Sequence, residues 1–421
     1  MNYCERTRVC HSLITEEAVK EALRADKGSG AQLVSWKIKD FTRKGDNYVA
    51  LVTSVETEYA LGGGGKGQVS YVIKANPCHD AISYENVTHA IFLKEADFYT
   101  NLLPHMNAIL QATNVGMLDM PVCYYSKMER KKEIIILEDL RTRGFKMFDR
   151  RKGLDVAHAK LALKGLAKLH AASLLLQERK PDSLEAKLLN RPWGNLVEGS
   201  TNVLPILERT LDTSVTILSK IGGYESSIVW VKNVKAKLQE IFENDVKSTK
   251  YHVLCHGDAW NNNMLFKYSD DATPEAVMLL DLQACRRVSF ANDLNFLLYT
   301  SLTGDVRKPN LDALLETYRG HFNAVMEAGG GALRLGREEV VGEFRRKNTI
   351  GAIFGMVTIG VVLVDPKEAV EVEACEEGNF DRAFEEVKKK TLAMLETNPL
   401  LRPRFLAMFD EFIESGLIPS A

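Results

Sequence analysis

The sequence predicts an α+β protein with two lobes, a small antiparallel-sheet lobe over residues 1–140 and a larger, mainly helical lobe over 141–421. Over the first 80 residues, apolar and polar residues alternate in short runs separated by turn residues, which is typical of strands. Beyond residue 144 the apolar residues recur with a helical period. A chain of 421 residues, 45% hydrophobic and 26% charged, is long enough for one large or two medium globular domains.

The first lobe should contain an antiparallel meander followed by a helix and two more strands. After one short helix, the three strands of the meander are expected at 35–41, 48–59 and 68–75. The next helix is expected over 85–103, ended by Pro104, because proline interrupts the helical hydrogen bonds. Strands are expected at 123–127 and 133–137, before a hinge at 138–144.

The glycine run 61–67 resembles a phosphate-binding loop, but a hairpin connection is expected there. Lys66 is followed by Gly67, whereas a Walker motif has Ser or Thr at this place. The turn that would cover a phosphate should lie between the first two strands of the meander, at residues 44–48. Its candidate residues, Gly45 and Asn47, are chosen on position alone.

The second lobe should be helical at both ends and contain short strands in between. Its strongest helix is expected over 154–177, strand-and-loop segments over 251–266 and 277–282, and helices from about residue 293 onward. The segment 349–364 is uncharged and could be mistaken for a membrane span. Since a span usually needs about 20 residues, a buried core helix is expected at this segment, without a membrane partner.

Composition excludes several classes of protein. Lys plus Arg total 54 and Asp plus Glu total 56, so bulk charge does not favour nucleic-acid binding. The seven cysteines include no C-x-x-C pair, which argues against a zinc ribbon or a disulfide framework and favours a reducing compartment. The N-terminal segment is too polar for a signal peptide, so a cytoplasmic location is expected.

The densest polar cluster is the run from His256 to Asn263, which lies between two apolar segments. It contains Asp258, and Asp281 follows at the end of the next apolar run. In a kinase active site, an Asp orients the attacking hydroxyl, while an Asn and a second Asp hold magnesium. We therefore expect Asp258 to be the catalytic base and Asn263 and Asp281 to be metal ligands. The alternative is that these residues only form turns.

Lys74 is the candidate for binding phosphate, because it comes late in the third strand of the meander. Glu95 lies on the apolar face of the following helix, where an unpaired carboxylate would be costly. We therefore expect Lys74 and Glu95 to form an ion pair. The alternative is a solvated lysine at a strand end.

Other polar residues near these motifs have structural interpretations. His170 lies on an apolar helix face and is expected to be a core histidine hydrogen-bonded to backbone. Asp293 should brace the catalytic loop or cap a helix. His256 is expected to organise the loop rather than act as a base. The pair Arg286–Arg287 is either a phosphate or substrate contact or a solvated pair.

Together these motifs resemble the ecdysteroid kinase-like family, also called the CHK kinase-like family. It belongs to the protein-kinase-like superfamily with the aminoglycoside and choline kinases. The similarity extends over roughly residues 30–415, and its motifs are His256-Gly257-Asp258 with Asn263, Asp281-Leu282-Gln283, Ile136 to Leu140, and Leu169-His170-Ala171.

The resemblance implies a bilobal protein-kinase-like fold and ATP- and magnesium-dependent phosphorylation of a small-molecule hydroxyl, with ecdysteroids or xenobiotics as acceptors. It implies that Glu138 and Leu140, at the hinge, lie beside the adenine. Leu282 departs from the aromatic residue that often stands between the Asp and the Gln. The segment 281–293 is too short for the activation segment of a protein kinase, so a small-molecule acceptor is favoured over a peptide.

A second hypothesis is an inactive kinase-fold protein that binds small apolar ligands. Such a protein would be expected to lack the lysine, the base or a metal ligand. Trp193, Trp230 and Trp260 are candidates for apolar walls of the acceptor site. Cys255 and Cys285 lie beside the proposed site in the sequence and suggest sensitivity to thiol reagents.

Overall fold

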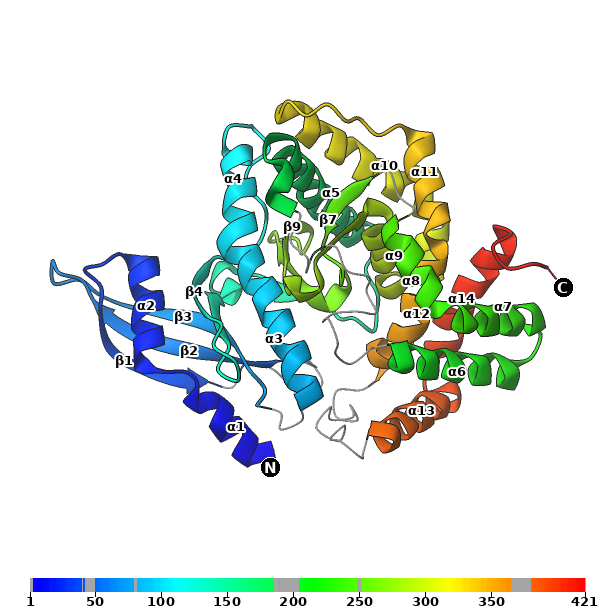
Figure 1. Cartoon of the computed structure of the whole chain (residues 1–421), viewed down its shortest axis with the longest axis horizontal. Helices are drawn as coiled ribbons and strands as arrows, with labels where there is room; N and C mark the ends of the chain where they lie inside the picture. Colours follow the sequence, from blue (N-terminus) through cyan, green and yellow to red (C-terminus); the bar gives the residue numbers. More distant parts are fainter. Residues whose placement is uncertain are drawn as a thin grey trace.

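The computed structural model describes residues 3–39, 41, 50–78, 82–184, 189, 204–247, 251–364 and 380–420. The predicted α+β architecture of two lobes is confirmed (Figure 1). The first lobe contains α1 (Tyr3–Ser12), α2 (Glu16–Lys27), β1 (Gln32–Lys39), β2 (Leu51–Ala60), β3 (Lys66–Ala75), α3 (Ile82–Asp97), η1 (Phe98–Leu102), α4 (Leu103–Gln111), β4 (Cys123–Lys127) and β5 (Ile134–Glu138).

These five strands form one antiparallel sheet in the order β1-β2-β3-β5-β4. The meander is confirmed, and the glycine run connects β2 to β3 as a hairpin, with Ala60 opposite Lys66. Alternation along the strands directs Val55, Tyr71 and Ile73 into a small core that also includes residues of α2. The N-terminal segment contains two helices where the sequence predicts one, because α2 has its own N-cap at Thr15.

The helix after β3 does not end at Pro104, so this prediction is wrong. α3 continues through the π-helical turn η1 into α4, where Pro104 stands in the first turn. A proline is tolerated in the first turn of a helix, because the N–H that it lacks would have no helical partner there. The wider turn η1 lies directly before α4 and is closed by a bond from Leu103 N to Phe98 O.

The second lobe is mainly helical and contains two small sheets, in the orders β10-β7 and β6-β8-β9. Its elements are η2 (Leu140–Arg143), β6 (Lys146–Met147), α5 (Val156–Arg179), η3 (Pro181–Leu184), α6 (Leu204–Ile221), α7 (Glu225–Ala236), α8 (Leu238–Lys247), β7 (His252–Cys255), η4 (Asn261–Asn263), β8 (Met264–Tyr268), β9 (Pro274–Leu279), η5 (Leu282–Ala284), β10 (Arg286–Ser289), α9 (Phe290–Ser301), α10 (Gly304–Ala328), α11 (Arg337–Arg346), α12 (Asn348–Leu363), α13 (Phe380–Thr397) and α14 (Leu401–Glu414).

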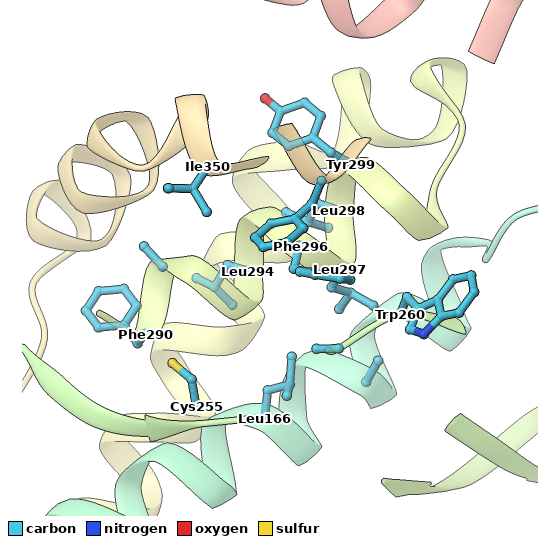
Figure 2. Close-up of a cluster of buried hydrophobic side chains, with 14 of the residues drawn as sticks. Leu166, Cys255, Trp260, Phe290, Leu294, Phe296, Leu297, Leu298, Tyr299 and Ile350 are labelled. Atoms are coloured by element: carbon cyan, nitrogen blue, oxygen red, sulfur yellow. The ribbon is translucent and has the colours of Figure 1, made fainter. Parts of the chain in front are cut away.

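The core of this lobe surrounds α9, every residue of which is buried. α5 and α12 pack against α9, and the close-up shows Leu294, Phe296 and Leu297 of α9 in this cluster (Figure 2). β7 runs next to α5 and α9, so the loop that follows β7 starts from a rigid base. The main core also includes residues of α3, η1 and α4, and these helices lie between the first sheet and the second lobe (Figure 1).

The uncharged segment forms α12, and most of its residues are buried by the surrounding helices, as the core-helix interpretation predicts. Within the described part of the chain, no single helix is long and apolar enough to cross a membrane. The pair α11 and α12, bent by 54°, would meet such a test only as a broken span, by length and composition.

Candidate active site

A cleft of about 440 Å³ lies where the two lobes meet. Its walls come from the sheet of the first lobe, the hinge, the loop after β7 and the turn after β9. The described lining residues that carry polar groups are Lys74, Glu95, Tyr99, Glu138, Asp139, Arg141, Lys146, Asp258, Trp260, Asn262, Asn263, Asp281 and Gln283. The cleft therefore brings together the predicted residues from both lobes that the structure describes.

Lys74 lies at the centre of a buried ionic cluster. Its Nζ donates to Glu95 Oε2 at 2.5 Å and to Asp281 Oδ1 at 2.9 Å. The predicted Lys74–Glu95 pair is therefore present, and Lys74 is not a solvated strand-end lysine. Burial opposes the charge of Lys74, but the carboxylates of Asp281 and Glu95 outweigh burial and raise its pKa. Burial raises the pKa of Glu95 as well, although Lys74 opposes this shift.

Asp258 is half-buried on the loop that follows β7. The pKa of Asp258 is raised to about 7, mainly because burial disfavours its charged form and also because the negative charge of Asp281 lies nearby. Asn263 limits this shift, because its Nδ2 donates to Asp258 Oδ2 at 2.9 Å and to the backbone oxygen of Asp258 at 2.9 Å. A carboxyl group that titrates near neutral pH is suited to accept a proton.

Asp293 holds this loop in place, which is the bracing role that the sequence suggests. Its two carboxylate oxygens accept from the backbone N–H of His256 at 2.6 Å and of Gly257 at 2.9 Å. The cap of α9 is Ser289 rather than Asp293. Burial alone would raise the pKa of Asp293, but the hydrogen bond from His170 and the charge of that histidine hold it below its ordinary value.

His170 is buried, as expected, but its partners are side chains rather than backbone. Its Nδ1 lies 2.9 Å from Tyr318 Oη and its Nε2 lies 3.0 Å from Asp293 Oδ2. The period of α5 places His170 in the core, whereas its partners come from α9 and α10, which the local pattern does not reveal. His256 organises the loop from within: its Nε2 lies 2.8 Å from Leu280 O, and its Nδ1 accepts from Asp258 N at 3.3 Å.

Gly257 is required where the loop passes the turn after β9. Its φ is +80°, and a Cβ at this position would lie 2.1 Å from the backbone oxygen of Ala284. Asp281 also has a positive φ, of 65°, a conformation that Asp tolerates better than most residues with a Cβ. The two loops therefore approach each other closely enough to bring Asp258 and Asp281 into one cleft.

The residues proposed to hold a metal offer the right type of ligand. The carboxylate of Asp281 accepts from Lys74 and, at 3.2 Å, from Gln283 Nε2. Because Asn263 directs its Nδ2 at Asp258, its Oδ1 is the atom left for a cation. A carboxylate and an amide oxygen are hard ligands of the kind that magnesium prefers.

The hinge residues line the cleft as expected. Glu138 uses its carboxylate structurally, accepting from Arg143 Nη1 at 3.0 Å, and its backbone N–H donates to Val122 O at 2.8 Å. Leu140 is buried and packs with Phe145 of the second lobe. Gly45 and Asn47, the candidate residues of the phosphate turn, lie outside the described residues.

Some sequence expectations near the site are wrong. Arg286 is buried in β10, so the pair Arg286–Arg287 is not a solvated pair, and neither arginine is among the described residues that line the cleft. Cys255 and Cys285 are fully buried, and burial raises the pKa of both thiols, which contradicts the expected sensitivity to thiol reagents. Trp230 packs on Phe412 and is absent from the described lining.

Tyr99 and Gln283 are among the lining residues that sequence reasoning missed. Tyr99 lies on η1, four residues after Glu95, and its buried hydroxyl has no hydrogen-bond partner among the described residues. The four-residue spacing from Glu95 is the signal that could have identified Tyr99. Gln283 lines the cleft and donates a hydrogen bond to Asp281. From the sequence, Gln283 is identified only as part of a family motif, with no predicted role in the site.

Comparison with known proteins finds a matching protein family and several similar structures. The model of the ecdysteroid kinase-like family matches residues 44–329. Among solved structures, Plasmodium vivax ethanolamine kinase aligns at 14% identity and a TM-score of 0.37, covering 96% of this chain and 89% of that chain. A thermostable mutant of an aminoglycoside phosphotransferase, in its apo form, aligns at 13% identity and a TM-score of 0.29, covering 90% of this chain and 99% of that chain. No curated protein matches significantly.

The family match spans most of the first sheet, the hinge, the loop with Asp258 and the turn with Asp281. It therefore includes all the described residues that line the cleft, apart from Phe41. The chain belongs to the ecdysteroid kinase-like family.

Proposed function

We propose that this protein is an ATP- and magnesium-dependent kinase that phosphorylates a hydroxyl group of a small molecule, such as an ecdysteroid, a related steroid or a xenobiotic. The observation that carries the proposal is the meeting of Lys74, Asp258 and Asp281 in one cleft between the lobes. Family membership supports the same reaction class.

The first lobe, residues 1–140, would hold ATP. Lys74 would exchange its bond to Asp281 for phosphate oxygens, while Glu95 keeps the ammonium group in position. The backbone at Glu138 and Leu140 would bind the adenine, since the carboxylate of Glu138 is engaged by Arg143. The turn that contains Gly45 and Asn47 would cover the phosphates.

The second lobe, residues 141–421, would supply the base and the acceptor site. Asp258 would orient the acceptor hydroxyl and take its proton, and its raised pKa suits this task near neutral pH. Asn263 and Asp281 would hold magnesium, which when bound neutralises charge on the phosphate oxygens. An inactive binder is the less favoured alternative, because the lysine, the base and both metal ligands are all retained here.

The test is a thermal-shift titration with ATP, with and without magnesium, on the wild type and on Asp281→Asn. At 100 times the dissociation constant, a ligand stabilises a protein by about 2.7 kcal/mol, which corresponds to a shift of about 3 °C for a chain of this length. The shift should require magnesium in the wild type and be largely lost in Asp281→Asn. The control Asp271→Asn changes an exposed aspartate of the β8–β9 turn and should respond as the wild type does.

Acceptors would then be found by incubating the wild type with ATP, magnesium and hydroxylated steroids, amino alcohols or plant glycosides, and measuring the mass gain of one phosphate. A wild-type protein that shows no magnesium-dependent shift and transfers no phosphate would contradict the proposal.

A further inference from the structure

Two side chains of the catalytic loop carry polar atoms that are buried without a hydrogen-bond partner. These atoms are Trp260 Nε1 and both amide atoms of Asn262, none of which has a partner among the described residues. Both residues line the cleft beside Asp258. A buried tryptophan N–H usually finds a partner, so an unpaired N–H in a candidate active site indicates a partner that arrives with a ligand.

The backbone around these side chains is fixed. Trp260 N donates to Asp258 O at 3.0 Å, and Trp260 O accepts from Asn263 N at 3.0 Å. Asn261, between them, is anchored by Ser301 Oγ at 3.0 Å and by Phe148 O at 3.2 Å. Trp260 and Asn262 are therefore held at a fixed place relative to Asp258, and Trp260 lies at the edge of the buried cluster around α9 (Figure 2).

The chemistry of the two groups limits what they can bind. An indole N–H only donates and is uncharged, whereas an asparagine amide both donates and accepts. Apart from Asp258, the carboxylates of the described lining are bound by cations: Glu95 and Asp281 by Lys74, Glu138 by Arg143, and Asp139 by Arg141. The two unpaired groups next to Asp258 are thus neutral donors and acceptors, which suit the oxygen of a hydroxyl or carbonyl group.

We propose that Trp260 Nε1 and the side-chain amide of Asn262 form a subsite that binds an oxygen of an uncharged acceptor beside Asp258. This inference rests on the proposed function, because it assumes that the acceptor hydroxyl lies at Asp258. The hydrogen bond from Trp260 N to Asp258 O joins the backbone of Trp260 directly to that of the base. Both groups are shielded from solvent, so an acceptor reaches them only after the covering side chains move.

The test measures acceptor binding separately from phosphate transfer. Ecdysone is titrated calorimetrically into the full chain with magnesium and a non-hydrolysable ATP analogue, and the affinity of the analogue is measured in parallel. Trp260→Phe removes the N–H and keeps an aromatic ring. It should weaken ecdysone binding about tenfold, the value expected for one lost hydrogen bond in a buried site, and change analogue affinity less than twofold.

Asn262→Ala should also weaken ecdysone binding about tenfold. The substitution breaks no side-chain hydrogen bond within the described part of the protein, because neither amide atom of Asn262 has a partner there. The matched control is Trp230→Phe, whose ring packs on Phe412 at 6.2 Å between centroids, outside the described lining. It should leave both affinities unchanged. Ethanolamine, a cationic amino alcohol, should bind the wild type more weakly than ecdysone.

Three results would overturn the subsite: no ecdysone binding by the wild type, equal binding by the wild type and both cleft variants, or a larger loss for the ATP analogue than for ecdysone. The last result would assign the indole to a phosphate oxygen. If binding follows the prediction but the wild type transfers no phosphate from ATP, the subsite stands and the proposed function fails.

Discussion

Asp258 should lower the stability of the folded protein at neutral and alkaline pH, and Asp258→Asn should remove this effect. Burial and the charge of Asp281 raise the pKa of Asp258 from 3.8 to about 7. A carboxyl group with a higher pKa in the folded protein binds its proton more tightly there than in the unfolded chain. Its contribution to stability is therefore present at low pH and is lost as the pH rises from about 4 to about 7.

The size of the effect follows from the shift. A change of roughly 3 pKa units corresponds to about 4 kcal/mol once the pH is above 7, and to roughly 1.7 kcal/mol at about pH 5. The free energy of unfolding of Asp258→Asn, relative to the wild type, should therefore rise by roughly 2–3 kcal/mol between about pH 5 and pH 8. For a chain of this length the equivalent change in melting temperature is about 3 °C.

The assay is denaturant or thermal unfolding of both proteins across this pH range, in buffer with a chelator so that no metal binds beside Asp258. Asp271→Asn is the control, because Asp271 is exposed and its hydrogen bonds with Ser269 and Thr273 lower its pKa. It should show no such gain. A difference between Asp258→Asn and the wild type that stays flat, or that falls as the pH rises, would refute the reasoning. Asp258→Asn should also retain magnesium-dependent ATP binding while phosphate transfer is abolished.

Two further substitutions test how the loop with Asp258 is held. Gly257→Ala should lower the melting temperature and abolish activity, because the added Cβ would lie 2.1 Å from Ala284 O. The control is Gly30→Ala, where an added Cβ meets no atom within 4 Å, and it should behave as the wild type in unfolding and activity assays. Asp293→Asn should destabilise the protein by about 2 kcal/mol and lower kcat, since an amide offers one acceptor oxygen in place of two. Asp305→Asn, on the exposed start of α10, is its control, and equal unfolding free energies for this pair would contradict the bracing role.

Features that local patterns determine could be predicted from the sequence. The alternation in β2 and β3 and the turn residues between them specify the antiparallel hairpin, because each strand must bury one face. The Lys74–Glu95 pair follows from a similar rule. A carboxylate on the apolar face of α3 needs a cation, and β3 offers one nearby.

Features that depend on distant parts of the chain could not be predicted. Pro104 looks like a helix end, yet η1 and α4 continue the helix because packing against the second lobe stabilises the whole segment. His170 meets Tyr318, which lies 148 positions along the chain. Arg286 and Arg287 look alike in the sequence, and only the position of β10 in the second lobe shows that Arg286 is buried.

The charge balance of the cleft supports the proposal that it binds a cation. Glu95, Asp258 and Asp281 are held close together, and Lys74 is the cation that pairs with two of them. Burial and mutual repulsion raise the pKa of both Glu95 and Asp258, so the site is short of positive charge. A divalent cation between Asn263 and Asp281 would supply that charge and release Lys74 to bind phosphate. Because the three carboxylates repel one another and compete for Lys74, metal binding would thus be coupled to ATP binding.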